Sequence, residues 1–510
     1  MTARIWIDVE DIFAFAATGR TPTGIQRLAF ELCRALHEIH GHNGEIRLVR
    51  QSRDRRTFVE VPWQSLDELF DQLASRSVPQ PEPGLPDPSQ SAAPSVPEGK
   101  SGWRGMVRTG LRPVLPLIPQ RLRMPLIHYV RLQARAIFAF IHLCWAIIRA
   151  AGALVRFLWR GGKRSPAVVA AEPVIFEPGS PLEAKSESEI EPLWEAQPGD
   201  VLFIMGAAWF HPDYAAVLDA ARQAHGVRVA ALIYDIIPLR RPEWCDRQHA
   251  EVFQGWFESV LPRCDRIFAI SRASADEVTD YARLHNLCLR DVIHPIPIGT
   301  GFAQSRTLDK IPAPADATAF AGLPEPGSYV LFVSTIEARK NHALLFRVWR
   351  NLLEQMPPER VPVLVFAGRI GWLVQDLMQQ LRNTAFLNGK IMLVEHPTDA
   401  ELVALYRGCR FTLFPSFYEG WGLPVTESLA FGKPCIISNR TSLPEAGGSL
   451  ARYFDPEDVA DAERVIRETI EDPEGLAQWE ARVVREFRPV PWEDSARAVM
   501  RHLQVDRTLA

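Results

Sequence analysis

Short apolar runs alternate with amphipathic segments along most of the chain, and this pattern predicts an α/β protein. Residues 4–8 are typical of a buried strand, and residues 21–27 open a segment whose apolar side chains recur at helical spacing. Further strands are predicted at residues 199–206, 227–234, 266–270, 328–334, 361–368, 391–394 and 410–415. Residues 491–503 form a final amphipathic helix. Strands separated by helices favour parallel sheets.

One long stretch interrupts this pattern. Residues 77–100 contain seven prolines, and residues 165–197 mix proline, serine and glutamate, so neither stretch is suited to a hydrophobic core. We interpret residues 77–198 as an insertion into the first domain. The predicted domains are therefore 1–76 with 199–304, then 305–485, followed by a C-terminal segment 486–510. A chain of 510 residues is too long for one core.

The net charge of −4 hides a strong asymmetry. Residues 100–171 hold eleven arginines and two lysines with no aspartate or glutamate, so the rest of the chain carries 44 basic and 61 acidic side chains. The basic side chains are interleaved with aromatic and aliphatic residues. This composition is typical of a helix in an anionic membrane interface, which we expect at residues 101–165. The segment is too apolar for a solvated nucleic-acid-binding arm, so we expect no nucleic acid partner.

Two alternatives for the basic segment remain open. Its longest uncharged run has thirteen residues, between Arg135 and Arg149, whereas a spanning helix needs about 20. A segment lying on the membrane is therefore favoured over a spanning one. The second alternative is a pair of hydrophobic helices buried inside the insertion.

Cysteine usage and the N-terminus indicate where the protein works. The seven cysteines are scattered and include no C-x-x-C pair, which disfavours a disulfide framework or a zinc site and favours a reducing compartment. The first residues lack the long apolar run of a signal peptide. We expect a cytoplasmic protein that is peripheral on the inner face of the cell membrane.

The most informative stretch is residues 417–434, which begin FYEGWGLPVTE. Glu419 and Glu427 are eight residues apart across a predicted loop-to-helix junction, and Pro424 suits the first turn of that helix. Gly420 and Gly422 then lie at the helix N-terminus, where free N–H groups and the helix dipole favour an anion. Such N–H groups suit phosphates, and the flanking carboxylates can accept hydrogen bonds from sugar hydroxyls. Together they indicate a nucleotide-sugar pocket.

This stretch resembles the E-x7-E signature of retaining glycosyltransferases of the GT-B fold, most closely glycosyltransferase family 4. The resemblance covers about residues 1–40 and 200–510, and its motifs are densest at 334–341 and 414–447. It implies two Rossmann-like domains facing a cleft, with the donor bound mainly to the second. It also implies that the helix of residues 486–510 crosses back to the N-terminal domain. It also implies that Glu427 binds the ribose and Glu419 the hexose, beside Gly420, Gly422 and Leu423.

A second motif, TIEARKN at residues 335–341, follows the strand that opens the second domain. Arg339 offers a bidentate fork and Lys340 a point charge, and both suit a diphosphate. The motif is similar to the family's E-x-R-K-N element. The resemblance therefore implies that Arg339 and Lys340 hold the donor diphosphate.

Other positions are matched by resemblance or by place in the chain. Gly24 matches the glycine of the family's N-terminal loop, close to the donor phosphates. Asp235 matches the aspartate of an H-D-x-x-P element near the acceptor, but Tyr234 replaces the histidine, so a proton shuttle is not expected there. Asp235 either orients the acceptor or caps the next turn. Gly368 and Arg369, with residues 371–372, are expected to line the base pocket.

We expect neither a metal nor a resident cofactor. The acidic group Asp8, Glu10 and Asp11 follows the first strand, but such loop acids are usually solvated or cap a turn. The predicted function is retaining, metal-independent transfer of a hexose from a nucleotide-diphosphate sugar, with GDP-mannose favoured, to a membrane-associated glycan or lipid-linked acceptor. The resemblance implies that the departing phosphate oxygen accepts the acceptor's proton. The alternatives are a nucleotide-sugar epimerase of the same fold and a non-catalytic membrane scaffold.

Overall fold

The computed structural model describes residues 3–17, 24–75, 194–300 and 322–504. By its internal contacts the chain divides into two units, residues 1–79 with 178–510 and residues 80–177. The second unit lies outside the described residues, as does the predicted membrane segment 101–165. All elements below belong to the first unit.

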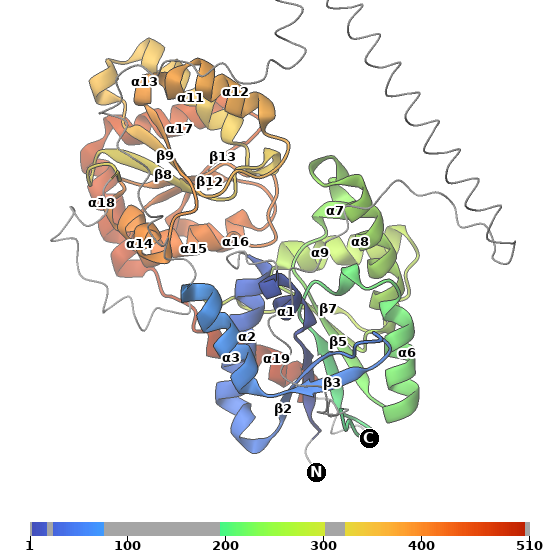
Figure 1. The fold of residues 1–510 in the computed structure, drawn as a ribbon. Coiled ribbons are helices and arrows are strands. Elements are labelled where there is room, and N and C mark those ends of the chain that lie inside the picture. The colour runs from blue at the N-terminus through green and yellow to red at the C-terminus, as the bar shows by residue number, and fades with distance from the viewer. Residues whose placement is uncertain (1–2, 18–23, 76–193, 301–321, 505–510) are drawn as a thin grey trace, which may run out of the picture. The chain divides into compact units, whose positions relative to one another are not determined.

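The N-terminal part of this unit is a seven-stranded sheet (Figure 1). Its strands, in chain order, are β1 Ile5–Asp8, β2 Ile46–Gln51, β3 Phe58–Val61, β4 Val201–Ile204, β5 Arg228–Ile233, β6 Arg266–Ala269 and β7 Ile293–Pro295. The spatial order is β3-β2-β1-β4-β5-β6-β7. All neighbours are parallel except β2 and β3, which form an antiparallel pair at one edge. Parallel pairing places the carboxyl ends of β1, β4, β5 and β6 at one edge of the sheet.

Helices cover both faces of this sheet. They are α1 Glu10–Ala17, α2 Ile25–His40, α3 Trp63–Ser75, α6 Tyr214–His225, α7 Ile237–Arg240, α8 Arg247–Val260 and α9 Arg272–Leu284, with short 3₁₀ turns that include η4 Ala208–Phe210 and η5 Pro242–Trp244. Successive residues of a strand point to opposite faces. Accordingly, Ile5 and Ile7 pack in one core while Trp6 packs in the other.

The C-terminal part is a six-stranded, fully parallel sheet in the order β10-β9-β8-β11-β12-β13. Its strands are β8 Tyr329–Val333, β9 Val363–Ala367, β10 Ile391–Val394, β11 Thr412–Phe414, β12 Cys435–Ser438 and β13 Arg452–Phe454. Its helices are α11 His342–Gln355, α12 Gln375–Asn383, α13 Ala385–Gly389, α14 Asp399–Gly408, α15 Leu423–Ala430, α16 Leu443–Gly447, α17 Val459–Glu471 and α18 Pro473–Glu486, with the 3₁₀ turn η8 Ala338–Lys340.

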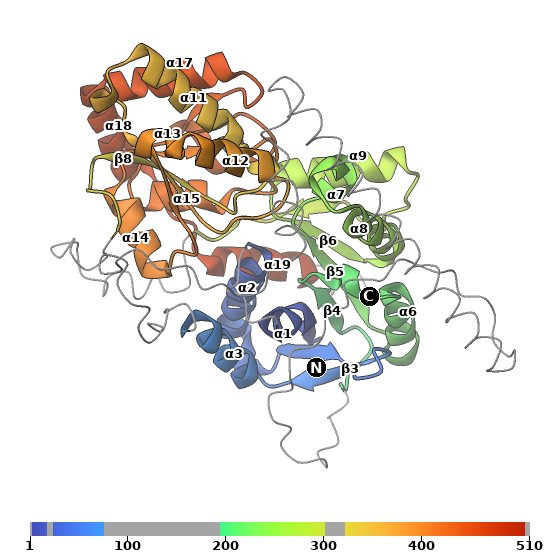
Figure 2. The ribbon, with the colours of Figure 1, turned by 45° about the horizontal axis from the view of Figure 1, so that its top comes forward.

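The last helix, α19 Trp492–Gln504, packs against α2 rather than against the second sheet (Figures 1 and 2). Its buried side chains Val499, Met500 and Leu503 belong to the same core as Ile5 and Ile7 of β1. The chain therefore returns to the first sheet after completing the second.

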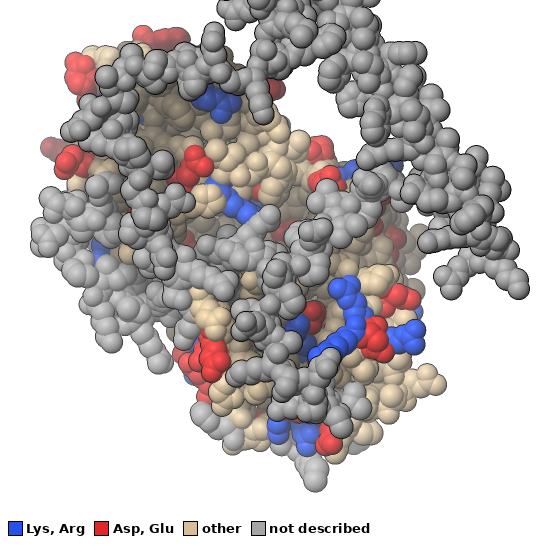
Figure 3. Space-filling model, in the orientation of Figure 1, with Lys and Arg blue, Asp and Glu red and all other residues tan. Residues whose placement is uncertain are grey.

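The predicted fold class is confirmed, because both sheets are of the parallel α/β kind. The antiparallel β2–β3 edge was not predicted. The predicted domain boundaries and the insertion at 77–198 stay predictions. Among the described helices, none combines the length and the apolar character that crossing a bilayer requires. On the face drawn in Figure 3, acidic and basic side chains of the described residues are interspersed rather than separated by sign.

Candidate active site

Arg339, Lys340 and Glu419 form a compact ionic cluster. Lys340 Nζ lies 2.6 Å from one Glu419 carboxylate oxygen, and Arg339 Nη1 lies 2.9 Å from the other. Arg339 Nη2 also donates to Glu337 Oε1 at 2.8 Å. A guanidinium has five donors and an ammonium three, so these carboxylates do not exhaust the donors of either cation. The cluster can therefore hold a further anion.

The local backbone explains why the two cations lie side by side. They occupy η8, which begins five residues after the end of β8, and Asn341 precedes α11 in the left-handed region at φ 60°. Asn341 Nδ2 donates to Pro415 O at 3.3 Å and to Pro456 O at 2.9 Å. These bonds fasten the cationic turn to the segments that follow β11 and β13.

Electrostatics keep Glu419 ionised. Burial favours the protonated form, but the charges of Arg339 and Lys340 outweigh it and lower the pKa of Glu419 to about 2. The same contacts raise the pKa of Arg339 above its ordinary value, although burial alone would lower it. Arg339 and Glu419 are thus both charged at neutral pH, whereas burial lowers the pKa of Lys340.

The loop before α15 is held by residues that follow β12. Glu419 N donates to Thr441 Oγ1 at 3.0 Å, and Ser442 Oγ donates to Glu419 O at 2.9 Å and to Trp421 O at 3.0 Å. Gly422 precedes α15 at φ 107°, and a Cβ there would lie 2.7 Å from a Leu443 methyl. Glycine is therefore required. In the first turn, which starts at Leu423, Pro424 has no N–H and Val425 N donates to Gly422 O at 2.9 Å.

Glu427 lies inside α15 and is 7% exposed. Its Oε2 accepts from the hydroxyl of Tyr406, on α14, at 2.9 Å. Burial raises its pKa to about 7, although the Arg27 charge and the Tyr406 hydrogen bond act in the opposite direction. Arg27, on α2, pairs with Asp399 at 3.1 Å. Glu419 and Glu427 are therefore both buried carboxylates but have opposite pKa shifts.

Asp235 follows β5 and lies near the ionic cluster. Its pKa is raised by burial and lowered by the Arg339 charge, with a net upward shift. Its Oδ1 accepts from Ile237 N at 3.0 Å, so it does cap the next turn. A Cβ on Gly420 would lie 2.4 Å from Tyr234 O, which explains a glycine at that position. The Tyr234 side chain is buried, and its hydroxyl donates to Met205 O.

The expected base-pocket residues lie against the cationic turn. A Cβ on Gly368, at φ 150°, would lie 2.1 Å from Ser334 O, and Arg369 O accepts from Ile336 N at 2.9 Å. Arg369 Nε is buried and has no hydrogen-bond partner among the described residues. The structure thus brings residues 368–369 to the turn at 334–340.

Gly24 and the acids after β1 lie in the N-terminal part. Gly24 precedes α2 at φ 46°, which suits glycine. Asp8 accepts from Glu10 N and from the Tyr214 hydroxyl, and burial raises its pKa to about 7. Asp8 is therefore a buried cap rather than a solvated one. Within the described residues, no three His, Cys, Asp or Glu side chains are grouped so that they could hold a metal ion.

Sequence analysis assigned no role to four residues that shape this site: Arg27, Glu337, Tyr406 and Ser442. Glu337 and Ser442 lie within the motif-dense ranges, so their position was a usable signal. Tyr406 precedes Glu427 by 21 residues and carries no local signal. Ser271 lies between β6 and α9. Its hydroxyl oxygen caps α9 by accepting from Ser274 N at 2.9 Å.

Comparison with known proteins confirms the family resemblance. Residues 317–483 match the family model described as "Glycosyl transferases group 1". Over 303 residues the chain is 27% identical to the serotype-specific mannosyltransferase WbdA of Escherichia coli, covering 58% of this chain and 36% of that protein. Over 166 residues it is 34% identical to the O-antigen chain mannosyltransferase B of Escherichia coli, covering 32% and 43%. The chain thus spans less than half the length of these two relatives.

Among solved structures, the chain is similar to Anabaena Alr3699/HepE in complex with UDP. The TM-score is 0.45 and the sequence identity 15%, over 60% of this chain and 79% of that one.

Proposed function

Starting from the group 1 glycosyltransferase domain at residues 317–483, we propose that the protein transfers a hexose from a nucleotide-diphosphate sugar to a glycan or lipid-linked acceptor. The reaction proceeds with retention and without a metal. The observation that carries this proposal is the Arg339–Lys340–Glu419 cluster beside the N-terminus of α15, with the buried Glu427 in the same helix.

Each site residue has a role under this proposal. Arg339, Lys340 and the N–H groups at Gly422 and Leu423 bind the diphosphate and stabilise the charge that develops on it as it leaves. Glu419, ionised at neutral pH, accepts from hexose hydroxyls. Glu427 accepts from the ribose hydroxyls, while Gly24, Gly420, Gly368 and Arg369 line the donor.

The transfer step needs no reactant besides the donor and the acceptor. The bond between the anomeric carbon and the β-phosphate oxygen breaks, and a bond from an acceptor oxygen to that carbon forms on the same face. The acceptor's hydroxyl proton passes to the departing phosphate oxygen. Asp235, near the cluster, orients the acceptor hydroxyl. Exclusion of water favours transfer over hydrolysis.

The proposed donor is GDP-mannose. Two matched relatives are described as mannosyltransferases, at 27% and 34% identity. The proposed acceptor class, a surface polysaccharide or its lipid-linked precursor, follows the printed description of one of them as an O-antigen chain mannosyltransferase.

A nucleotide-release assay tests the function. The purified full chain is incubated with GDP-, UDP- and dTDP-sugars, with and without a lipid extract and oligosaccharides, and with EDTA. We expect GDP release from GDP-mannose that rises with acceptor and is unaffected by EDTA, and an α-linked product by NMR. Conversion of the donor without nucleotide release would indicate an epimerase, and no turnover of any donor would indicate a scaffold.

We also propose that the basic segment 101–165 holds the protein on the anionic inner face of the cell membrane. The proposal rests on the excess of arginine among aromatic and aliphatic residues. Sedimentation with liposomes, with and without anionic lipid, compares the full chain with a deletion of residues 101–165. Equal partitioning of the two proteins onto anionic liposomes would refute the membrane role.

A further inference from the structure

The side chain of Glu445, on α16 of the C-terminal part, binds the first turn of α9 in the N-terminal part. Glu445 Oε2 accepts from Arg272 N at 2.9 Å, and its Oε1 accepts from Ala273 N at 2.8 Å. The contact joins residues that are 173 and 172 positions apart in the chain. The free N–H groups at the start of a helix and the helix dipole both favour an anion, so a carboxylate suits this place.

A second contact joins the same turn of α9 to the loop that carries Glu419. Ser274 is buried, and its hydroxyl lies 3.1 Å from Tyr234 O and 3.4 Å from Gly420 O, within hydrogen-bonding distance of both. One of these carbonyls directly precedes Asp235, and the other directly follows Glu419. The first turn of α9 therefore lies against the backbone of both assigned site residues.

Helix α16 is fixed to the same loop from its other end. Ser442 directly precedes α16, and its hydroxyl donates to Glu419 O at 2.9 Å and to Trp421 O at 3.0 Å. Glu445 follows three residues later in the first turn of this helix of five residues. Because one short helix makes both contacts, a shift of α9 relative to α16 would act on the Glu419 loop.

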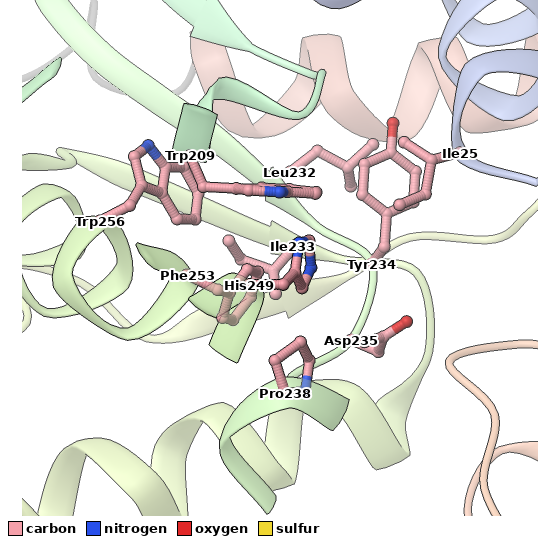
Figure 4. A pocket seen from close by; sticks show the side chains of 10 residues that line it. All are labelled: Ile25, Trp209, Leu232, Ile233, Tyr234, Asp235, Pro238, His249, Phe253 and Trp256. Carbon is pink, nitrogen blue, oxygen red and sulfur yellow. The ribbon is translucent and has the colours of Figure 1, made fainter. Parts of the chain in front are cut away.

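The position of Asp235 relative to that loop matters for the proposed reaction. Tyr234 and Asp235 lie directly after β5, where they line a small cavity with Trp209 and His249 (Figure 4). Asp235 is assigned to the acceptor hydroxyl, whereas Glu419 is assigned to the hexose of the donor. A misplacement of about 1 Å between reacting groups can lower a rate by about 100-fold. The contacts of α9 and α16 are placed to prevent such a misplacement.

We propose that Glu445 is a positioning residue for the transfer step: by binding the first turn of α9, it fixes the Glu419 loop relative to Asp235. The inference rests on the proposed function and adds to it a residue that touches neither donor nor acceptor. Glu445 is exposed and is not a member of the ionic cluster, so its loss should leave donor binding unchanged. A carboxylate that only capped α9 would affect stability and not kcat.

Hydrogen exchange of single amides tests the contact without an activity assay. Arg272 and Ala273 are the first two residues of α9, whose N–H groups have no partner within a helix, so their protection should come from Glu445. Ser274 N, which donates to Ser271 Oγ at 2.9 Å, is the internal reference. We expect Glu445→Ala to speed exchange at residues 272 and 273 about fivefold and to leave the reference amide unchanged.

The positioning role is tested from the side of α9. Arg272→Pro removes the N–H that Glu445 Oε2 accepts from, at the first helical position, where proline is tolerated. Ser271 before it is extended, at φ −155° and ψ 162°, as suits a residue that precedes proline. Arg272→Ala removes the same side chain but keeps the N–H, so it is the matched control. GDP binding by calorimetry and transfer kinetics are measured for the full chain with each change.

We expect Glu445→Ala to lower kcat about fivefold and Arg272→Pro to lower it in the same direction, with the Kd of GDP and the donor KM unchanged. Arg272→Ala should match the wild type. The double variant Glu445→Ala/Arg272→Pro should be no slower than Glu445→Ala alone, because both changes remove the same contact.

Four results would each overturn the inference. They are rapid exchange of the amides at 272 and 273 in the wild type, a wild-type kcat in Glu445→Ala, equal kcat values for Arg272→Pro and Arg272→Ala, and independent effects of Glu445→Ala and Arg272→Pro in the double variant. Donor turnover by the wild type with any of these results leaves the transferase function standing. Protected amides without turnover of any donor would instead refute that function and leave the contact in place.

Discussion

Lys340 Nζ and Glu419 Oε1 are 2.6 Å apart although 79 positions separate the two residues in the chain. The cation assigned to the donor diphosphate is thus held by the carboxylate assigned to the hexose. Under the proposed function, the donor meets a site in which the cations and the carboxylate are already paired and oriented. Such preorganisation avoids reorganisation during the reaction.

Replacing Glu419 by glutamine should separate catalysis from diphosphate binding. Glu419→Gln keeps the side-chain size but removes the negative charge beside Arg339 and Lys340. We expect transfer to fall by about 10²–10³-fold. GDP binding, measured calorimetrically, should be retained or tightened because the two cations lose a competing carboxylate.

The same variant should be less stable without ligand. Removing one partner of a buried ion pair lowers the free energy of unfolding by about 3–5 kcal/mol, and bound GDP should restore part of that loss. Glu480→Gln, which breaks the Lys433–Glu480 pair at 2.7 Å in the same domain, is the control. Transfer by Glu419→Gln at the wild-type rate would contradict the assigned role.

Glu427 should make stability depend on pH. Its folded-state pKa, about 7, is above its ordinary value of 4.5, so the folded protein binds the proton more tightly than the unfolded chain. The stabilising contribution is complete below pH 4.5 and is lost as the pH rises through about 7. Glu427→Gln lacks this titration. The difference in unfolding free energy between wild type and variant should therefore change by about 3 kcal/mol in the variant's favour between pH 4.5 and pH 8. If urea denaturation gave the same difference in unfolding free energy across that pH range, the pKa of Glu427 would not be raised in the folded protein.

Ser442 should act as a positioning residue. Its hydroxyl donates to Glu419 O and Trp421 O, so Ser442→Ala leaves two carbonyls without that donor. We expect stability to fall by about 1–3 kcal/mol and kcat to fall about tenfold with little change in donor KM. Ser442→Thr keeps the hydroxyl and should recover most of kcat. If threonine and alanine behaved alike, the hydroxyl would have no positioning role.

Gly368 should tolerate no side chain. A Cβ there would lie 2.1 Å from Ser334 O, at a φ of 150°. Gly327→Ala shares the strain of a positive φ, 77°, but its Cβ would have no neighbour within 4 Å. Thermal unfolding should show a larger loss for Gly368→Ala than for Gly327→Ala, by about 1–3 kcal/mol for the added clash. Equal losses would show that strain alone accounts for both.

Much of the site could be read from the sequence because its parts lie within contiguous motifs. Arg339 and Lys340 directly follow a predicted strand, and Glu419, Gly422 and Glu427 share one loop-to-helix junction. Apolar periodicity likewise predicted β5, β8 and β9. The β2–β3 edge was missed, because its two short strands lack a long apolar run.

The sequence by itself determined the alternation of strands and helices and the residue types at the two motifs, because backbone preference and apolar periodicity are local. Only the tertiary structure decided how those groups are charged and paired. Glu419 is ionised because Arg339 and Lys340 come from another strand's end, and Glu427 has a raised pKa because α15 is buried against Tyr406 of α14. The cavity lined by Trp209 of η4, residues 232–235 at the end of β5 and His249 of α8 likewise depends on segments that are distant in the sequence. Burial and ion pairing depend on which distant segments come together, which no local pattern specifies.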